Sequence, residues 1–246
     1  MSFSPSPRHS SAERRRAFSV FKFYIPLFKL TILCNFVNGV LFCYHMSMKI
    51  VSASFVKGIR GTDPLLSDPK PEFAFVGRSN VGKSSVINAL VNHKGLAKSS
   101  SSPGKTKEIN FFLINNAFYF VDLPGYGYAR AADGDKEKLV KHIMWYLFES
   151  EAPISLVLVL IDAHIGPTDR DIEMIKALTE GKLPFVVLGN KFDRINKTAR
   201  PKAIKDITAA LGGIPFIPFS AEKKEGIPEV LQKIEEAILT RSGNVF

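Results

Sequence analysis

The sequence has little cysteine, and the little it has is confined to one end of the chain. Cys34 and Cys43 are the two cysteines among 246 residues, so the part from Met48 to Phe246 contains none. That part can therefore form neither a disulfide framework nor a zinc site with cysteine ligands. A reducing cytoplasm is its natural setting.

The sequence also lacks a histidine arrangement typical of a metal or catalytic site, and it lacks internal repeats. His142 and His164 show neither the spacing of metal ligands nor an obvious carboxylate partner, so neither is a catalytic candidate. The sequence contains no internal repeat. With 46% apolar residues, a chain of 246 residues can bury the core of one large domain or of two small ones.

Acidic residues are outnumbered by basic ones, and half of the excess lies near the start. Residues 1–47 carry six Lys or Arg and one Glu, a net +5, and subtracting this from the formal +10 leaves +5 for the rest. Such a surplus is compatible with a polyanionic partner such as RNA. Solvated lysines on an ordinary protein surface are the commoner explanation.

The first 47 residues are expected to be a leader outside the folded domain. Residues 1–18 have the Ser-, Pro- and Arg-rich composition of a disordered segment. The 19 residues from Leu30 to Met48 carry no formal charge, which approaches the length of a membrane span, but polar residues such as Asn35 interrupt them. Three interpretations stay open: a membrane anchor, an organelle-targeting leader, or a mis-assigned start ahead of an initiator at Met46 or Met48.

The strongest signal is the segment from Gly77 to Ser84, which matches the phosphate-binding pattern G-x-x-x-x-G-K-[ST]. It follows the apolar run Phe73–Val76, typical of a buried parallel strand, and precedes apolar residues at helical spacing. Glycines at both ends of the pattern let successive backbone amides face phosphate oxygens. Lys83 is predicted to reach the β- and γ-phosphates, and the Ser84 hydroxyl to ligate Mg²⁺.

Apolar runs and helical patterns alternate along the rest of the chain. Strand and helix alternation with short links predicts a three-layer α/β domain around a mostly parallel sheet. We expect this domain to span residues 72–246, after an extended lead-in over 48–71. The apolar runs are Phe111–Ile114, Tyr119–Val121, Leu156–Ile161, Phe185–Leu188 and Phe216–Phe219, and the helical patterns lie near 135–150, 169–180, 199–211 and 228–240.

The pattern D-x-x-G, formed by Asp122, Leu123, Pro124 and Gly125, directly follows one of these strands. Ligands of open α/β sheets bind at the carboxyl ends of the strands. Asp122 can hold Mg²⁺ through water there, and the Gly125 amide can contact a γ-phosphate and lose that contact on hydrolysis. The position after the phosphate loop makes a simple turn the weaker interpretation.

The pattern Asn190-Lys191-Phe192-Asp193 follows another strand and predicts the choice of base. A carboxylate accepts two parallel hydrogen bonds from the N1–H and 2-amino groups of guanine, and adenine has no such donor pair. Asp193 is therefore predicted to select guanine. Asn190 and Lys191 are predicted to connect the base pocket to the phosphate loop.

Two further segments complete the predicted site. Ser220, Ala221 and Glu222 follow the strand ending at Phe219 and can offer backbone amides to the guanine oxygen. Thr106 lies in a loop ahead of the expected edge strand, where a GTPase needs a second Mg²⁺ ligand that the γ-phosphate orders.

The segments GRSNVGKSS, SPGKTKEINFF, DLPGYGYA, NKFD and FSAEKKEGI resemble the EngB (YihA/YsxC) family of bacterial GTPases, within the Era-like, translation-factor class. The resemblance runs from about Met48 to the C-terminus. It implies a single Ras-like P-loop domain with a six-stranded, mostly parallel sheet and one antiparallel edge strand. It also implies Ser84 and Thr106 as magnesium ligands, with catalytic roles for Lys83, Thr106 and Gly125. The nucleotide contacts that it implies are Gly77, Arg78, Ser79, Asn80, Val81, Gly82, Lys83, Ser84, Gly104, Lys105, Thr106, Lys107, Glu108, Asp122, Leu123, Pro124, Gly125, Asn190, Lys191, Phe192, Asp193, Phe219, Ser220 and Ala221.

Three positions bear on how closely the chain follows this family. Asn190 stands where threonine is usual in the family, a change that other GTPases make without losing guanine recognition. Tyr126 stands where a Ras-type enzyme has the glutamine that orients the attacking water, so slow intrinsic hydrolysis is expected. Asn80 occupies the position that helps to bind K⁺ in potassium-activated GTPases, although a role in stabilising the loop is an equal alternative.

The resemblance implies a monomeric cytoplasmic switch that binds GTP and GDP and acts in late assembly of the large ribosomal subunit, with its precursor rRNA and proteins as partners. Members of the family are needed for normal cell division and septation. The alternative is a membrane-tethered GTPase acting directly at the septum, for which residues 1–47 would be required. A P-loop ATPase or kinase is disfavoured by the guanine motif at 190–193.

Overall fold

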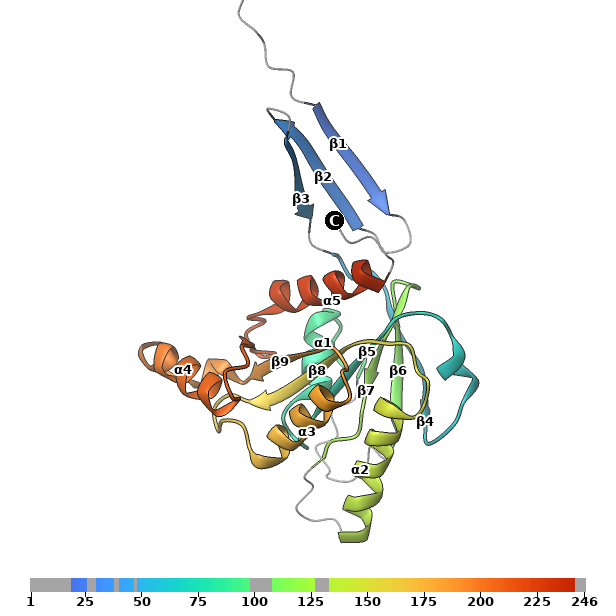
Figure 1. The fold of residues 1–246 in the computed structure, drawn as a ribbon, viewed down its shortest axis with the longest axis vertical. Coiled ribbons are helices and arrows are strands. Elements are labelled where there is room, and N and C mark those ends of the chain that lie inside the picture. Colours follow the sequence, from blue (N-terminus) through green and yellow to red (C-terminus); the bar gives the residue numbers. More distant parts are fainter. Residues whose placement is uncertain are drawn as a thin grey trace, which may run out of the picture.

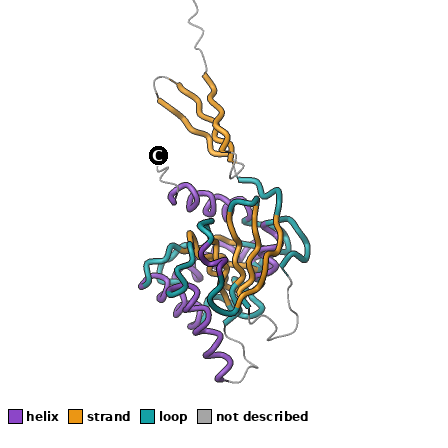
Figure 2. The backbone as a smooth tube through the Cα atoms, turned by 90° about the vertical axis from the view of Figure 1, so that its right-hand side faces the viewer, coloured by secondary structure: helices purple, strands orange, loops and turns teal. Residues whose placement is uncertain are grey.

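The computed structural model describes residues 19–25, 30–37, 40–46, 48–97, 108–126 and 133–241, without the side chains of 19–46 and 133–136. Within this part of the chain the strands form two sheets, one of three strands and one of seven. Figure 2 shows the two sheets as separate groups of strands.

The larger sheet confirms the mostly parallel α/β fold. In order across the sheet it consists of β10 (Phe216–Pro218), β9 (Phe185–Asn190), β8 (Ile154–Asp162), β5 (Glu72–Gly77), β7 (Phe118–Asp122), β6 (Ile109–Ile114) and β4 (Ala53–Ile59) (Figure 1). Only β6 among these strands runs in the opposite direction to the others, because it pairs antiparallel with both of its neighbours, β7 and β4. The expected count of six strands was wrong, because β4 adds a seventh outside β6 and becomes the edge.

The extra strand β4 lies in the lead-in, which is anchored by one side chain of the turn between β6 and β7. The Asn115 carboxamide oxygen accepts hydrogen bonds from the amides of Val51 and Ser52 at 2.8 and 3.1 Å, and its nitrogen donates to the Lys49 carbonyl at 2.8 Å. Met48 is buried in the core next to this segment. The lead-in therefore belongs to the packed domain.

Helices cover both faces of the sheet because apolar side chains alternate along its strands. In β5, Phe73 and Phe75 belong to one core cluster, and Ala74 and Val76 to the other. The central strand β5 is buried on both faces, so its sequence from Phe73 to Val76 is a continuous apolar run. The helices α1 (Lys83–Leu90) and α5 (Ile227–Arg241) pack on the first face, and α2 (Asp133–Phe148), α3 (Asp169–Glu180) and α4 (Arg200–Ala210) on the second (Figure 1).

The smaller sheet occupies the segment that was expected to be a leader. It consists of the antiparallel strands β1 (Ser19–Ile25), β2 (Leu30–Val37) and β3 (Val40–Met46). The uncharged stretch that approaches membrane-span length therefore contains two strands. Among the described residues, no helix is both long enough and apolar enough to cross a membrane.

Glu72, at the start of β5, is a fully buried acid, and it makes stability depend on pH. Tyr146 of α2 donates a hydrogen bond to one of its carboxylate oxygens. Burial raises the pKa of Glu72 from 4.5 to about 7, with the nearby Asp68 adding to the effect and Arg241 opposing it. A raised folded-state pKa stabilises the fold fully below the unfolded value of 4.5, and this stabilisation is lost as the pH rises through about 7.

We expect Glu72→Gln to be more stable than the parent chain at pH 8.5, by about 2 kcal/mol or a Tm rise of about 5 °C. The neutral amide still accepts the Tyr146 hydrogen bond and has no charge to bury. The difference should be much smaller at pH 5, where Glu72 is already protonated in the folded state. Thermal melts at the two pH values measure it, with the exposed Glu229→Gln as the matched control. An equal change in Tm at both pH values would contradict the raised pKa of Glu72.

Candidate functional site

The phosphate loop between β5 and α1 requires both of its pattern glycines. Gly82 has φ +101°, and a Cβ there would lie 2.5 Å from the Asn190 side-chain nitrogen. A Cβ on Gly77 would lie 2.7 Å from the Leu160 carbonyl oxygen of β8. Asn80 also adopts the left-handed region, with φ 63°. The loop is therefore held in a conformation that few sequences can adopt.

Three side chains with opposite or complementary polarity meet beneath this loop. Lys83 donates to the Gly77 carbonyl at 3.2 Å, and the Ser84 hydroxyl donates to Asp122 Oδ2 at 2.9 Å. Burial raises the pKa of Asp122 and lowers that of Lys83, and the attraction between the two charges opposes both effects. Lys83 and Ser84 of the phosphate loop thus form one polar centre with Asp122 of the D-x-x-G segment, as their motifs predict.

This centre has donors that suit Mg²⁺. Asp122 Oδ1 is buried and has no hydrogen-bond partner among the described residues. With the Ser84 hydroxyl beside it, the centre offers hard oxygen ligands, which Mg²⁺ prefers. The residues present therefore fit the ion, which Ser84 would ligate directly and Asp122 would hold through water.

The guanine motif is bonded to the phosphate loop through two side chains. Asn190 donates to the Val81 carbonyl at 2.8 Å. Lys191 donates to the Asn80 carbonyl at 3.0 Å and to Asp162 Oδ2 at 2.7 Å. These contacts connect the carboxyl ends of β8 and β9 with the loop after β5, which is the arrangement that the motif predicts.

Asp193, predicted to recognise the base, is held in place by the segment after β10. The Ser220 hydroxyl donates to Asp193 Oδ1 at 2.6 Å, and the Ser220 backbone pairs with Glu225. The Ala221 amide, predicted to face the guanine oxygen, donates to Asn190 Oδ1 at 3.2 Å in this structure. Ser220 is thus a side-chain partner of Asp193, in addition to its predicted backbone role.

The D-x-x-G glycine lies directly on the phosphate loop. Ser79 donates its hydroxyl to the Gly125 carbonyl at 3.1 Å and its amide to the Tyr126 carbonyl at 2.9 Å. A Cβ on Gly125 would lie 2.9 Å from the Ser79 Cα, amide nitrogen and hydroxyl oxygen. Tyr126 is buried, and its hydroxyl donates to Asp171 Oδ1 at 2.8 Å.

Five of the predicted contacts have buried apolar side chains, so they can offer a ligand only their backbone. Arg78 instead pairs with a protein carboxylate, its Nε lying 3.5 Å from Asp171 Oδ2. Glu108 pairs with the exposed Arg60. The predicted residues Gly104, Lys105, Thr106 and Lys107 lie outside the described residues. The five contacts with buried apolar side chains are Val81, Leu123, Pro124, Phe192 and Phe219.

Two aspartates of this region were missed by the motif analysis. Asp162 ends β8 and binds Lys191, so its place at the carboxyl end of an apolar strand was a usable signal. Asp171 closes a capping box with Thr168 at the start of α3, and the spacing T-x-x-D was the signal for it. Both acids hold other site residues in position.

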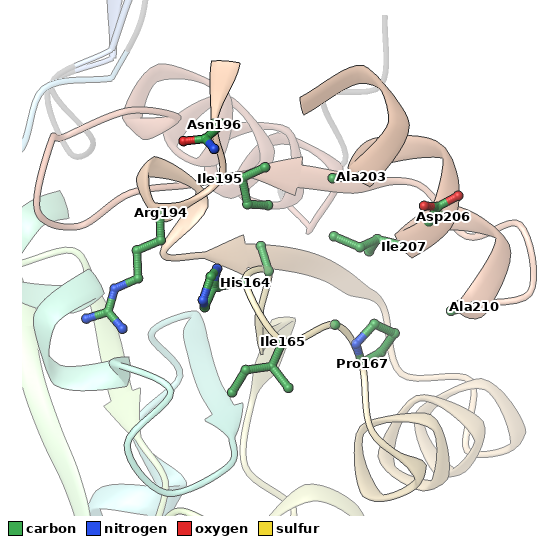
Figure 3. A pocket seen from close by; sticks show the side chains of 12 residues that line it. His164, Ile165, Pro167, Arg194, Ile195, Asn196, Ala203, Asp206, Ile207 and Ala210 are labelled. Atoms are coloured by element: carbon green, nitrogen blue, oxygen red, sulfur yellow. The ribbon is translucent and has the colours of Figure 1, made fainter. Parts of the chain in front are cut away.

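A groove of about 570 Å³ lies beside the guanine motif but is separate from the predicted contacts. Figure 3 shows Ile195 and Ile207 on one side of it and Ile165 and Pro167 on the other. None of the predicted nucleotide contacts lines it. This groove is therefore distinct from the nucleotide site that the hydrogen-bonded motifs predict.

Comparison with known proteins agrees with this geometry. Residues 72–191 match the family model of the 50S ribosome-binding GTPases, and residues 149–240 match the elongation factor Tu GTP-binding domain. The chain is 42% identical over 193 residues to a probable GTP-binding protein EngB of Caldanaerobacter subterraneus subsp. tengcongensis, which covers 78% of this chain and 99% of that protein. The chain belongs to the EngB family of GTP-binding proteins.

Other EngB comparisons are consistent. The EngB protein of Thermoanaerobacter pseudethanolicus is 42% identical over 191 residues, covering 77% of this chain and 99% of that protein. A crystal structure of a probable GTP-binding protein engB is 24% identical, covers 68% of this chain and 98% of that one, and has a TM-score of 0.57, which confirms the fold. Membership of the EngB family confirms the resemblance and makes this chain a GTP-binding protein with a GTPase domain.

Proposed function

We propose that this protein is a GTP-hydrolysing switch that binds a precursor of the large ribosomal subunit and is needed for normal cell division and septation. The observation that carries the switch is the bonding of Asn190 and Lys191 to phosphate-loop carbonyls, with Asp193 oriented by Ser220. This bonding supports a site that binds the guanine base and the phosphates of one nucleotide at the same time.

The ribosomal partner is supported by the description of the matched family model and by charge. Residues 48–246 carry the remaining +5 of the formal +10 after the +5 of residues 1–47 is subtracted. Lys94, Lys138 and Lys141 are exposed and available to a polyanion, although Lys141 also pairs with Glu137. We place the switch in the cytoplasm as a monomer, with residues 1–47 dispensable for this role.

Catalysis in this proposal is mainly electrostatic. Lys83 offsets charge on the β- and γ-phosphates, and the Gly125 amide contacts the γ-phosphate in the triphosphate state. Mg²⁺ bound by Ser84, by Asp122 through water and by Thr106 would neutralise charge on the phosphate oxygens. Thr106 enters from its sequence pattern and the family resemblance.

Hydrolysis is proposed to be slow without a partner and to be stimulated by K⁺. The buried Tyr126 hydroxyl is bonded to Asp171, so it is not offered to an attacking water. Asn80 would help to hold K⁺, which would take the place of an arginine finger. We expect turnover with ribosomal particles to be faster in KCl than in NaCl. Equal turnover in the two salts would contradict the role of K⁺.

The ribosomal role is tested by co-sedimentation of the full chain and of residues 48–246 with large-subunit particles. We expect both forms to sediment with the particles in a non-hydrolysable GTP analogue and to stay in the supernatant with GDP. An ATP analogue serves as the control for base selection. Absence of binding in either guanine nucleotide, with the full chain partitioning into membranes, would favour a tethered septal protein instead.

A further inference from the structure

Asp171 is a completely buried carboxylate on α3 that none of the nucleotide motifs includes. Its two oxygens have different partners. Oδ2 accepts from the Thr168 amide at 2.9 Å and the Thr168 hydroxyl at 2.8 Å, and lies 3.5 Å from Arg78 Nε. Oδ1 accepts from the Tyr126 hydroxyl at 2.8 Å. One carboxylate therefore joins the start of α3, the phosphate loop and the residue after Gly125.

The bond to Tyr126 holds the adjoining backbone against the phosphate loop. Tyr126 and Arg78 form a parallel bridge, and Ser79 donates to the carbonyls of both Gly125 and Tyr126. Tyr126 is 3% exposed, so its position is set by packing as well as by the hydroxyl. This set of contacts, from Asp171 through Tyr126 and Gly125 to Ser79, is called the tyrosine latch below.

The tyrosine latch closes the space that a third phosphate requires. A γ-phosphate is bound by the phosphate-loop lysine and by the D-x-x-G amide, so it lies between these two segments. In the latch, the Gly125 carbonyl, not its amide, accepts from the Ser79 hydroxyl at 3.1 Å, and the two residues lie so close that even a Cβ on Gly125 would collide with Ser79. A phosphoryl group cannot enter at this contact until Gly125 moves away.

We propose that Asp171 is a positioning residue that, through Tyr126, holds the latch closed and so favours the diphosphate over the triphosphate. This inference rests on the proposed function as a nucleotide-dependent switch. The triphosphate must break the latch, and its apparent affinity is lowered by the free energy of doing so. The diphosphate ends before the latch and leaves it intact.

Tyr126→Phe tests the latch because it removes one hydroxyl and keeps the buried ring. Loss of a hydrogen bond to a carboxylate is expected to raise the affinity for a non-hydrolysable GTP analogue about tenfold, with GDP affinity unchanged within about twofold. Asp171→Asn should shift the ratio of the GTP-analogue affinity to the GDP affinity in the same direction. Titration with fluorescent GDP and the fluorescent GTP analogue measures both affinities in the full chain.

Thr168→Ala is the matched control, because Thr168 contacts the other oxygen of Asp171. It should lower the Tm through loss of the helix cap while leaving the ratio of the two affinities unchanged. The inference is overturned if Tyr126→Phe weakens both nucleotides equally, leaves the ratio unchanged, or shifts it no more than Thr168→Ala does. If the parent chain binds neither guanine nucleotide, the proposed function itself fails. If both guanine nucleotides bind but the ratio of their affinities is unshifted, only the proposal about the latch fails.

Discussion

Replacing Asp193 with asparagine is expected to lower the affinity for GTP by about a thousandfold. The carboxylate that would accept from N1–H and the 2-amino group of guanine becomes an amide whose NH₂ group faces the 2-amino group. Two hydrogen-bond donors then face each other at the position where the parent chain would pair the 2-amino donor with a carboxylate acceptor. Ser220, which donates to Asp193 at 2.6 Å, keeps the new side chain in the same place.

The same substitution should create affinity for xanthosine triphosphate, whose 2-oxo group accepts from the new amide. Titration of both nucleotides against the parent and variant chains measures this exchange of specificity. Asp206→Asn, on the exposed face of α4, is the control and should change GTP affinity by less than about twofold. A parallel loss of both nucleotides would indicate a general collapse of the pocket and would contradict the assigned role.

Replacing Lys83 with alanine is expected to reduce GTP hydrolysis by about a thousandfold and GDP affinity by about a hundredfold. Lys83 is the buried cation opposite Asp122 beneath the phosphate loop. Its loss removes the charge that offsets the phosphates and leaves the buried Asp122 without its compensating cation.

Single-turnover hydrolysis and GDP titration separate the two expected effects of this change. Lys176→Ala is the matched control, because that lysine is exposed on α3 and pairs only loosely with Glu180, at 3.8 Å. We expect it to leave both quantities unchanged. Hydrolysis by Lys83→Ala at the parent rate would show that the loop does not bind phosphate as proposed.

The parts of the site that were predictable are those encoded by local spacing. The phosphate loop, D-x-x-G and the guanine motif each begin at the last residue of a strand, so their residue types define their positions without knowledge of the rest. The contacts between them are also as expected, because Asn190 and Lys191 reach phosphate-loop carbonyls.

The parts that were not predictable depend on pairing between distant segments. β4 was expected only as an extended segment, because its partner β6 begins some fifty residues later and its own apolar side chains, such as Phe55, are partly exposed. The Tyr126–Asp171 bond likewise joins residues that are 45 positions apart. Their conformation becomes definite only when the whole sheet is assembled.

The bonding of the guanine motif to the phosphate loop has a consequence for how the ligand leaves. Asn190 spans from the Val81 carbonyl to the Ala221 amide, and Lys191 spans from Asn80 to Asp162. A guanine nucleotide bound as proposed would therefore have its base and its phosphates held by one connected set of hydrogen bonds, so that loosening one end would weaken the other. A factor that accelerates nucleotide exchange would need to disturb only one of these two side chains to release both ends of the nucleotide together.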